Sequence, residues 1–138
     1  MRKILLIEDE KNTRELLVRL LSGSKRCFSG EVKIQQASGW DEGSRWVDAG
    51  GVDVVLLDLS LPPLDRQETS VRYAALAKTW PATIVITGHE EDELRRRMIG
   101  FGAQDYMQKD LAVITDPNAL MERIYNAWLR TRYQNGPK

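Results

Sequence analysis

The most apolar run of this chain is Val52-Asp53-Val54-Val55-Leu56-Leu57, and Asp58 follows it directly. An apolar run of this length, rich in valine and leucine, predicts a strand that is buried on both faces. We therefore expect residues 52–57 to form the central strand of a sheet. The end of this strand would place the Asp58 carboxylate in a largely buried position, where an unpaired charge is costly.

Short apolar runs alternate along the chain with segments of helical period. Strands are expected at residues 3–7, 32–37, 52–57, 83–87 and 105–107, and a helix is expected after each of them. This alternation predicts an α/β fold, a doubly wound five-stranded parallel sheet with helices on both faces. The polar pair Gln35-Gln36 favours an edge position for the second strand.

Polar residues at capping positions predict where several helices begin. The candidate caps are Asn12 with Glu15, Ser38 with Asp41, Asp65 with Glu68, and Asp116 before Pro117. The last helix has an apolar stripe that ends near Trp128. We expect one domain over residues 1–130, and an unstructured tail or the start of a linker over residues 131–138.

The composition limits the classes of function. The chain has 138 residues, of which 42% are hydrophobic and 29% charged, as in an ordinary globular domain. Twenty Lys and Arg balance twenty Asp and Glu, so the long-range attraction of a nucleic-acid or membrane binder is missing despite Arg95-Arg96-Arg97. Cys27 is the single cysteine, which favours a reducing compartment. Only four apolar residues precede Glu8, too few for a secretory signal, and no apolar run has the length of a membrane span. We expect a cytoplasmic protein that binds neither membranes nor, directly, nucleic acid.

Polar side chains follow four of the expected strands at the point where each strand ends. They are Glu8 and Asp9, Asp58, Thr87, and Lys109. Doubly wound sheets bind ligands beyond the carboxyl ends of their strands. Three carboxylates gathered there repel one another, so we expect a cation between them, and oxygen ligands favour Mg²⁺ over softer metals. A salt bridge between Lys109 and Asp58 is the plainer interpretation, but it leaves the other residues without a role.

At these positions the chain resembles the receiver domain of bacterial two-component response regulators, from Met1 to about Trp128. The motifs that carry the resemblance are Ile7-Glu8-Asp9-Glu10, Leu56-Leu57-Asp58-Leu59-Ser60-Leu61-Pro62, Thr87-Gly88, and Gly102-Ala103-Gln104-Asp105-Tyr106-Met107-Gln108-Lys109. Each motif alone is weak, but four in this order are specific. The resemblance implies the flavodoxin-like receiver fold with strand order 2-1-3-4-5. It also implies that a histidine kinase or histidine phosphotransfer protein transfers a phosphoryl group to Asp58.

The resemblance implies a magnesium site around the phosphoacceptor. Asp9, Asp58 and the Ser60 carbonyl would bind Mg²⁺, and Glu8 would act on the metal through water. Mg²⁺ would then support phosphorylation by small phosphodonors and hydrolysis of the acyl phosphate. A chain of this kind is a signalling phosphoacceptor with self-phosphorylation and self-dephosphorylation, rather than a metabolic enzyme.

The resemblance also implies how the signal would leave the site. Lys109 would pair with one phosphoryl oxygen and Thr87 would hydrogen-bond another. Thr87 and Tyr106 would form the switch, with Tyr106 turning inward behind Thr87. The fourth helix, the fifth strand and the last helix would then contact an effector or a second copy of the chain.

Several residues depart from the usual receiver pattern. Glu8 stands where Asp is commoner, and Arg66 stands where Gly is frequent. Asp110 replaces the proline that commonly follows the lysine, and a non-proline cis bond costs about 2.5 to 4 kcal/mol, so we expect Lys109–Asp110 to be trans. Ser60 and His89 stand where the family borders the path of the attacking water. For His89, a solvated loop position is an equally good interpretation.

Two other classes of protein share parts of this pattern. A degenerate receiver that acts as a phosphorylation-independent docking module would be expected to have lost Asp58, Asp9 or Lys109, and all three are present. A phosphatase with an aspartate nucleophile would have a second acid two residues after that nucleophile, where this chain has Ser60. The docking module is the main alternative to a phosphoacceptor.

Overall fold

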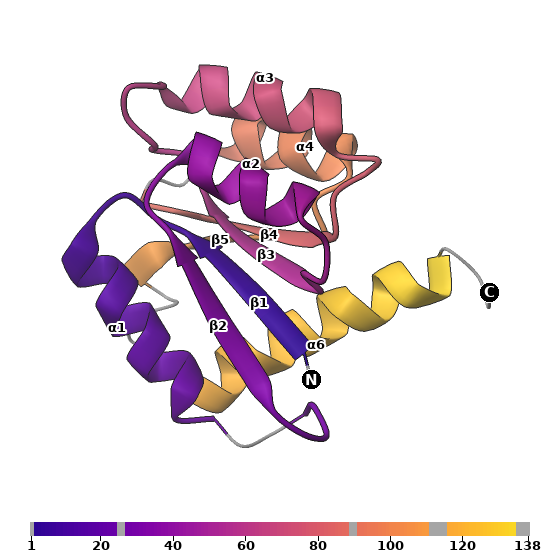
Figure 1. Ribbon diagram of the computed structural model, residues 1–138. Helices are drawn as coiled ribbons and strands as arrows, with labels where there is room; N and C mark the ends of the chain where they lie inside the picture. Colours follow the sequence, from indigo (N-terminus) through magenta and orange to yellow (C-terminus); the bar gives the residue numbers. More distant parts are fainter. Residues whose placement is uncertain (1, 25–26, 89–90, 111–115, 135–138) are drawn as a thin grey trace.

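The computed structural model describes residues 2–24, 27–88, 91–110 and 116–134 (Figure 1). Its strands are β1 (Arg2–Ile7), β2 (Val32–Ala37), β3 (Val54–Asp58), β4 (Ala82–Thr87) and β5 (Asp105–Gln108). They form one parallel sheet in the order β2-β1-β3-β4-β5. All residues of β3 are buried, and β2 lies at an edge with most of its residues partly exposed. The predicted doubly wound sheet and the position of its central strand are confirmed.

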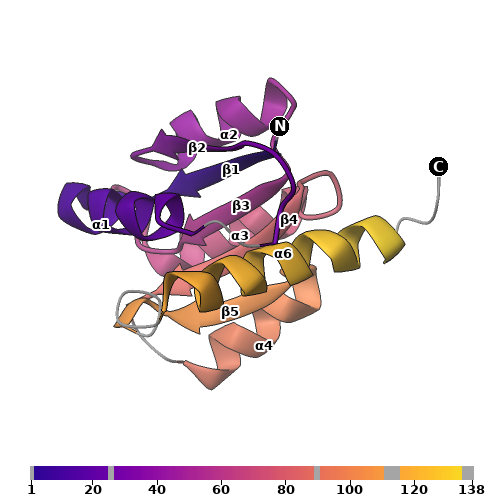
Figure 2. The same cartoon turned by 90° about the horizontal axis from the view of Figure 1, so that it is seen from below.

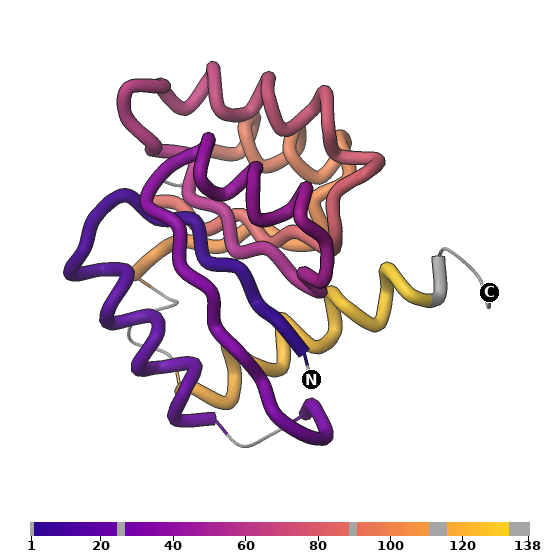
Figure 3. Tube along the Cα trace, in the orientation of Figure 1, coloured from indigo at the N-terminus to yellow at the C-terminus, as the bar shows by residue number. Residues whose placement is uncertain are grey.

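Helices cover both faces of the sheet. They are α1 (Lys11–Ser22), α2 (Trp40–Asp48), α3 (Arg66–Leu76), α4 (Asp92–Phe101) and α6 (Pro117–Gln134). Figures 1 and 2 show α1 and α6 on one face and α2, α3 and α4 on the other. The Cα trace in Figure 3 follows the chain from strand to helix along this path.

Two hydrophobic cores lie on the two faces of the sheet. Because side chains alternate along a strand, Ile4 and Leu6 of β1 pack with α1 and α6, whereas Leu5 and Ile7 pack with α2, α3 and α4. The strands are therefore apolar on both sides. This leaves their carboxyl ends as the place where polar side chains from several strands can meet.

Two predicted helix caps are confirmed. Asp65 accepts the N–H of Glu68 at 2.7 Å, and the Glu68 carboxylate accepts the N–H of Asp65 at 3.3 Å, which makes a complete capping box for α3. Asp116 accepts the N–H of Asn118 at 2.9 Å at the start of α6.

Two other predicted caps are wrong. The helix α1 begins at Lys11 after Glu10, so Asn12 lies inside its first turn. The helix α2 begins at Trp40 after Gly39, and the Ser38 hydroxyl contacts the Glu42 carboxylate at 3.4 Å. Capping residues also occur inside helices, and only the backbone conformation shows which residue lies just outside the helix.

The last helix is longer than predicted. Residues 131–134 continue α6, although we expected residues 131–138 to be unstructured or a linker. The Thr131 hydroxyl donates to the Ala127 carbonyl at 3.1 Å, and the Arg132 guanidinium lies 4.8 Å from the Trp128 ring centroid. These contacts favour further helical turns, and residues 135–138 lie outside the described part of the chain. No helix in the described ranges is long and apolar enough to cross a membrane.

Candidate functional site

The predicted site residues lie at the carboxyl ends of neighbouring strands. Glu8 follows β1, Asp58 is the last residue of β3, Thr87 is the last residue of β4, and Lys109 follows β5. The strands β1 and β4 both pair with β3. Asp58 is therefore flanked on one side by the acidic loop after β1 and on the other by the hydroxyl-bearing end of β4.

The Lys109 ammonium lies between two buried carboxylates. Its Nζ is 3.0 Å from Asp58 Oδ2 and 2.6 Å from Glu8 Oε1. The side chains of Asp58 and Glu8 are 3% and 1% exposed. Sequence reasoning considered a bond from Lys109 to Asp58 alone, and the structure adds Glu8 as a second partner.

The peptide bond after Lys109 is trans, as expected. The only cis peptide bond among the described residues is Pro62–Pro63. The Lys109 amine is directed at Asp58 although Asp110 stands where the family commonly has proline. This departure from the family pattern therefore leaves the lysine in contact with the acid cluster.

The site carries an excess of negative charge, because two buried carboxylates share one ammonium. The pKa of Asp58 is raised from 3.8 to about 7, because burial and then the neighbouring Glu8 raise it more than Lys109 and the Ser60 N–H lower it. The Ser60 N–H donates to Asp58 Oδ1 at 3.0 Å. Burial alone lowers the pKa of Lys109, but its hydrogen bonds and ion pairs with Glu8 and Asp58 outweigh burial and raise it. An added cation would relieve the carboxylate excess.

The residues predicted to bind a metal fit a hard cation. Glu8 and Asp58 are brought together, Asp9 is exposed in the next position of the same loop, and Ser60 lies two residues beyond Asp58. No three His, Cys, Asp or Glu side chains converge as a metal cluster within the described ranges. Mg²⁺ is commonly held by one or two carboxylates and keeps several waters, so it does not need such a cluster. The oxygen donors and the charge of the site suit this mode of binding.

Sequence analysis missed Arg14, which holds the loop after β1. Its Nη1 donates to the Glu8 carbonyl at 2.9 Å and lies 3.4 Å from the Asp9 carbonyl. Both partners are backbone atoms, so residue types alone do not reveal the contact. The available signal was an arginine placed about one turn into the helix that follows the acidic pair.

The two predicted switch residues, Thr87 and Tyr106, are both buried, and they lie on the neighbouring strands β4 and β5. Thr87 is 0% and Tyr106 1% exposed, so the tyrosine already lies inward. The Arg95 guanidinium lies 5.3 Å from the Tyr106 ring centroid. Burial raises the pKa of the Tyr106 phenol and Glu91 adds to the rise, whereas Arg66, Arg95 and the Thr87 hydroxyl oppose it. The expected role of His89 falls outside the described residues.

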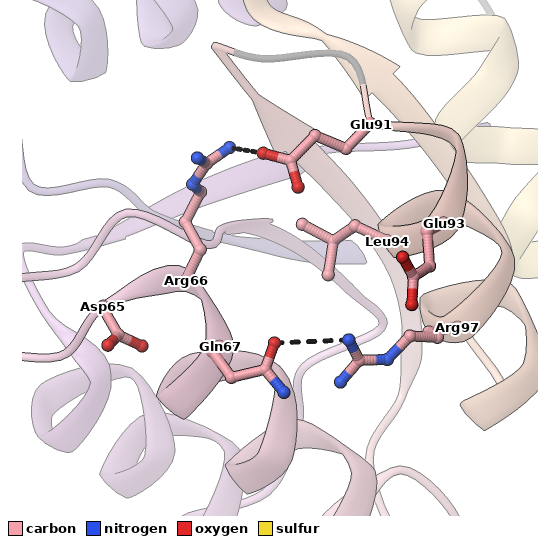
Figure 4. A pocket seen from close by; sticks show the side chains of 7 residues that line it. All are labelled: Asp65, Arg66, Gln67, Glu91, Glu93, Leu94 and Arg97. Carbon is pink, nitrogen blue, oxygen red and sulfur yellow. Dashed lines mark hydrogen bonds and ion pairs between the residues drawn. The ribbon is translucent and has the colours of Figure 1, made fainter.

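A polar pocket of about 370 Å³ opens between the beginnings of α3 and α4 (Figure 4). Arg66 forms an ion pair with Glu91, and Arg97 Nη1 donates to Gln67 Oε1 at 3.2 Å. The first interaction links α3 to the residue before α4, and the second links α3 to the middle of α4. Arg66 is the residue that replaces the family's frequent glycine, and here it contributes a contact that glycine cannot make. None of the lining residues is among the predicted site residues.

Comparison with known proteins agrees with this fold. Residues 4–125 match the family described as the response regulator receiver domain, and the chain belongs to that family of two-component signalling proteins. It is 29% identical over 130 residues to the response regulator UvrY of Escherichia coli O6:H1, covering 94% of this chain and 56% of UvrY. It is 30% identical over 111 residues to the cell cycle response regulator CtrA of Brucella ovis, covering 78% of this chain and 43% of CtrA. The chain thus spans about half the length of the curated relatives it matches.

The fold has close counterparts among solved structures. The CheY-like response regulator receiver domain protein from Methanospirillum hungatei superimposes with a TM-score of 0.76 over 99% of both chains. Its sequence identity of 19% makes this similarity evidence for the fold alone. The predicted resemblance to receiver domains is confirmed by the family match.

Proposed function

We propose that this chain is the phosphoacceptor receiver of a two-component phosphorelay. It would accept a phosphoryl group on Asp58 from a histidine kinase or histidine phosphotransfer protein. The observation that carries the proposal is the contact of Lys109 with both Asp58 and Glu8 at the end of β3. Burying two acids around one lysine is costly, so a degenerate receiver that is never phosphorylated would be expected to lose this arrangement.

The transfer step uses Asp58 as a nucleophile. One carboxylate oxygen forms a bond to phosphorus while the bond between phosphorus and the donor's histidine nitrogen breaks, and that nitrogen keeps the electron pair. The Ser60 N–H holds Oδ1 and the Lys109 ammonium holds Oδ2, so both oxygens have defined orientations. Catalysis of this kind depends mainly on positioning and on stabilising charge.

Lys109 and Thr87 would contact the transferred group. The ammonium is already within hydrogen-bond distance of Asp58, so it can pair with a phosphoryl oxygen after transfer. Thr87 ends the neighbouring strand and would donate its hydroxyl to another oxygen. Asp9, Asp58 and the Ser60 carbonyl would hold Mg²⁺, with Glu8 acting on it through water, and the bound ion would neutralise negative charge on the transferring group.

The signal would leave through Thr87 and Tyr106. Both are buried, and Tyr106 lies on β5 between the site and α4. A phosphoryl group that draws Thr87 toward it would change the packing behind Thr87 and shift the population of conformations. We propose that the surface of α4, β5 and α6 contacts an effector or a second copy of the chain.

The test is chemical labelling of the whole chain. Acetyl phosphate or phosphoramidate with Mg²⁺ should add one phosphoryl group, detected by intact mass spectrometry and removed by hydroxylamine. Asp58→Asn should abolish the label and keep the fold. The exposed residue Asp48 provides the matched control, and Asp48→Asn should be labelled like the wild type.

The outcome separates the two function classes. Loss of the label only in the Asp58 variant supports a phosphoacceptor. Equal labelling of the Asp58→Asn variant, or no labelling of the wild type by any donor including a competent kinase, would favour the phosphorylation-independent docking module.

A further inference from the structure

Arg14 lies in the first turns of α1 and reaches back over the loop that follows β1. Its Nη1 is 2.9 Å from the Glu8 carbonyl and 3.4 Å from the Asp9 carbonyl. A single guanidinium nitrogen therefore contacts the backbone of both acidic residues. No other side-chain donor to either carbonyl is found among the described hydrogen bonds.

The two carbonyls lie outside the regular hydrogen-bond ladders of β1 and α1. The Glu8 N–H still pairs with the neighbouring strand, donating to the Ala37 carbonyl at 3.0 Å. The first helical bond of α1 begins two residues later, from the Arg14 N–H to the Glu10 carbonyl at 2.9 Å. The helix also has no side-chain cap. Arg14 thus supplies a donor where the backbone would otherwise need water.

The orientation of these peptides determines where the acidic side chains point. Glu8 is turned into the site, where Oε1 meets Lys109 and Oε2 lies 3.3 Å from the Glu10 N–H. Asp9, the next residue, is exposed. A rotation of the peptide between Glu8 and Asp9 would move both carboxylates relative to Asp58.

We propose that Arg14 is a positioning residue for cation binding, a role that rests on the proposed phosphoacceptor function. Its guanidinium holds the backbone of Glu8 and Asp9, so that their carboxylates face the cation that Asp58 needs. The positive charge of Arg14 has the opposite effect, because it repels a cation bound nearby. When Arg14 is replaced, a positioning role therefore predicts a lower affinity for the cation, whereas the loss of positive charge predicts a higher one.

The experiment measures Mg²⁺ binding to the whole chain by isothermal titration calorimetry. Arg14→Gln removes the charge and the forked donor, and Arg14→Lys keeps the charge but loses the planar guanidinium. If Arg14 acts by positioning, Arg14→Gln should weaken Mg²⁺ binding about five- to tenfold, the effect of losing a hydrogen-bonded positioning contact. Arg14→Lys should weaken it severalfold. The matched control is Arg19→Gln on the exposed side of the same helix, which should leave the affinity unchanged.

A second readout separates positioning from a general loss of structure. Thermal unfolding in EDTA checks that each variant folds, and if Arg14→Gln does not, Arg14→Lys decides the question. The labelling rate with phosphoramidate should recover at saturating Mg²⁺ in a folded variant, because only the cation affinity has changed.

The outcomes for the two proposals are distinguishable. Unchanged or tighter Mg²⁺ binding by Arg14→Gln and Arg14→Lys would overturn the positioning role, and so would a wild type that binds no Mg²⁺. A wild type that binds Mg²⁺ but takes up no phosphoryl group would refute the proposed function, while the comparison of affinities would still test Arg14.

Discussion

Replacing Asp58 by Asn should make the metal-free protein more stable at pH 8, although the change removes part of an ion pair. Asp58 is 3% exposed and shares the Lys109 ammonium with Glu8. Burial and the neighbouring Glu8 together raise its pKa from 3.8 to about 7 against the opposing effects of Lys109 and Ser60, so the folded protein disfavours the ionised carboxylate. Asn has nearly the same shape and cannot ionise.

The sign follows from proton binding in the two states. The folded state binds the Asp58 proton more tightly than the unfolded state, so the free energy of unfolding falls as pH rises from about 4 to about 7. A rise in pKa from 3.8 to about 7 corresponds to a penalty of at most about 4 kcal/mol above pH 7. This penalty already includes the favourable contact of the Asp58 carboxylate with Lys109, and in the variant Lys109 keeps Glu8 as a partner. The gain of Asp58→Asn at pH 8 is therefore up to about 4 kcal/mol.

The assay is urea unfolding followed by circular dichroism at pH 5 and pH 8 in EDTA. The advantage of Asp58→Asn at pH 8 should fall to less than half at pH 5, because the folded wild type holds its proton there. Asp48→Asn on the surface should stay within about 0.5 kcal/mol of the wild type at both values. A less stable Asp58→Asn variant at pH 8, or a difference that does not change with pH, would refute the reasoning.

Two further predictions concern packing in the core and the solvent exposure of Tyr106. Gly43→Ala should destabilise the protein by about 1 to 2 kcal/mol, because the added Cβ would clash with the buried side chain of Ile7. Gly100→Ala, with open space around it, should stabilise the protein by about 0.5 to 1 kcal/mol. Similar urea midpoints for the two variants would contradict this. Arg66→Gln should increase the solvent exposure of Tyr106, measured by ¹⁹F NMR of fluorotyrosine, because the ion pair that links α3 to the start of α4 is lost. Arg97→Ala on the same pocket should leave the tyrosine signal unchanged, and an equal change in both variants would show that the ion pair has no special role.

Local patterns were sufficient to predict the strands and the main site residues. The run ending at Asp58 is apolar enough to require burial on both faces, and such a strand has to be central. The carboxyl ends of parallel strands meet at one edge, so the acids after β1 and β3 and the lysine after β5 had to approach one another. The strand order 2-1-3-4-5 came from the resemblance to receiver domains, because strand composition alone does not specify which strands are neighbours. The capping box at Asp65 was also readable, since it depends on residues three positions apart.

The particular partners of the site residues were decided by the tertiary structure. Lys109 and Asp58 are separated by 51 positions in the chain, and the approach of Lys109 to Glu8 as well depends on how two loops pack at the sheet edge. Arg14 binds backbone carbonyls, whose directions follow from where α1 begins, and Arg66 meets Glu91, which lies after β4 and directly before α4. Residue types determine which groups need a partner. The paths of the loops determine which partner comes within 3 Å, because hydrogen bonds and ion pairs weaken steeply with distance and angle.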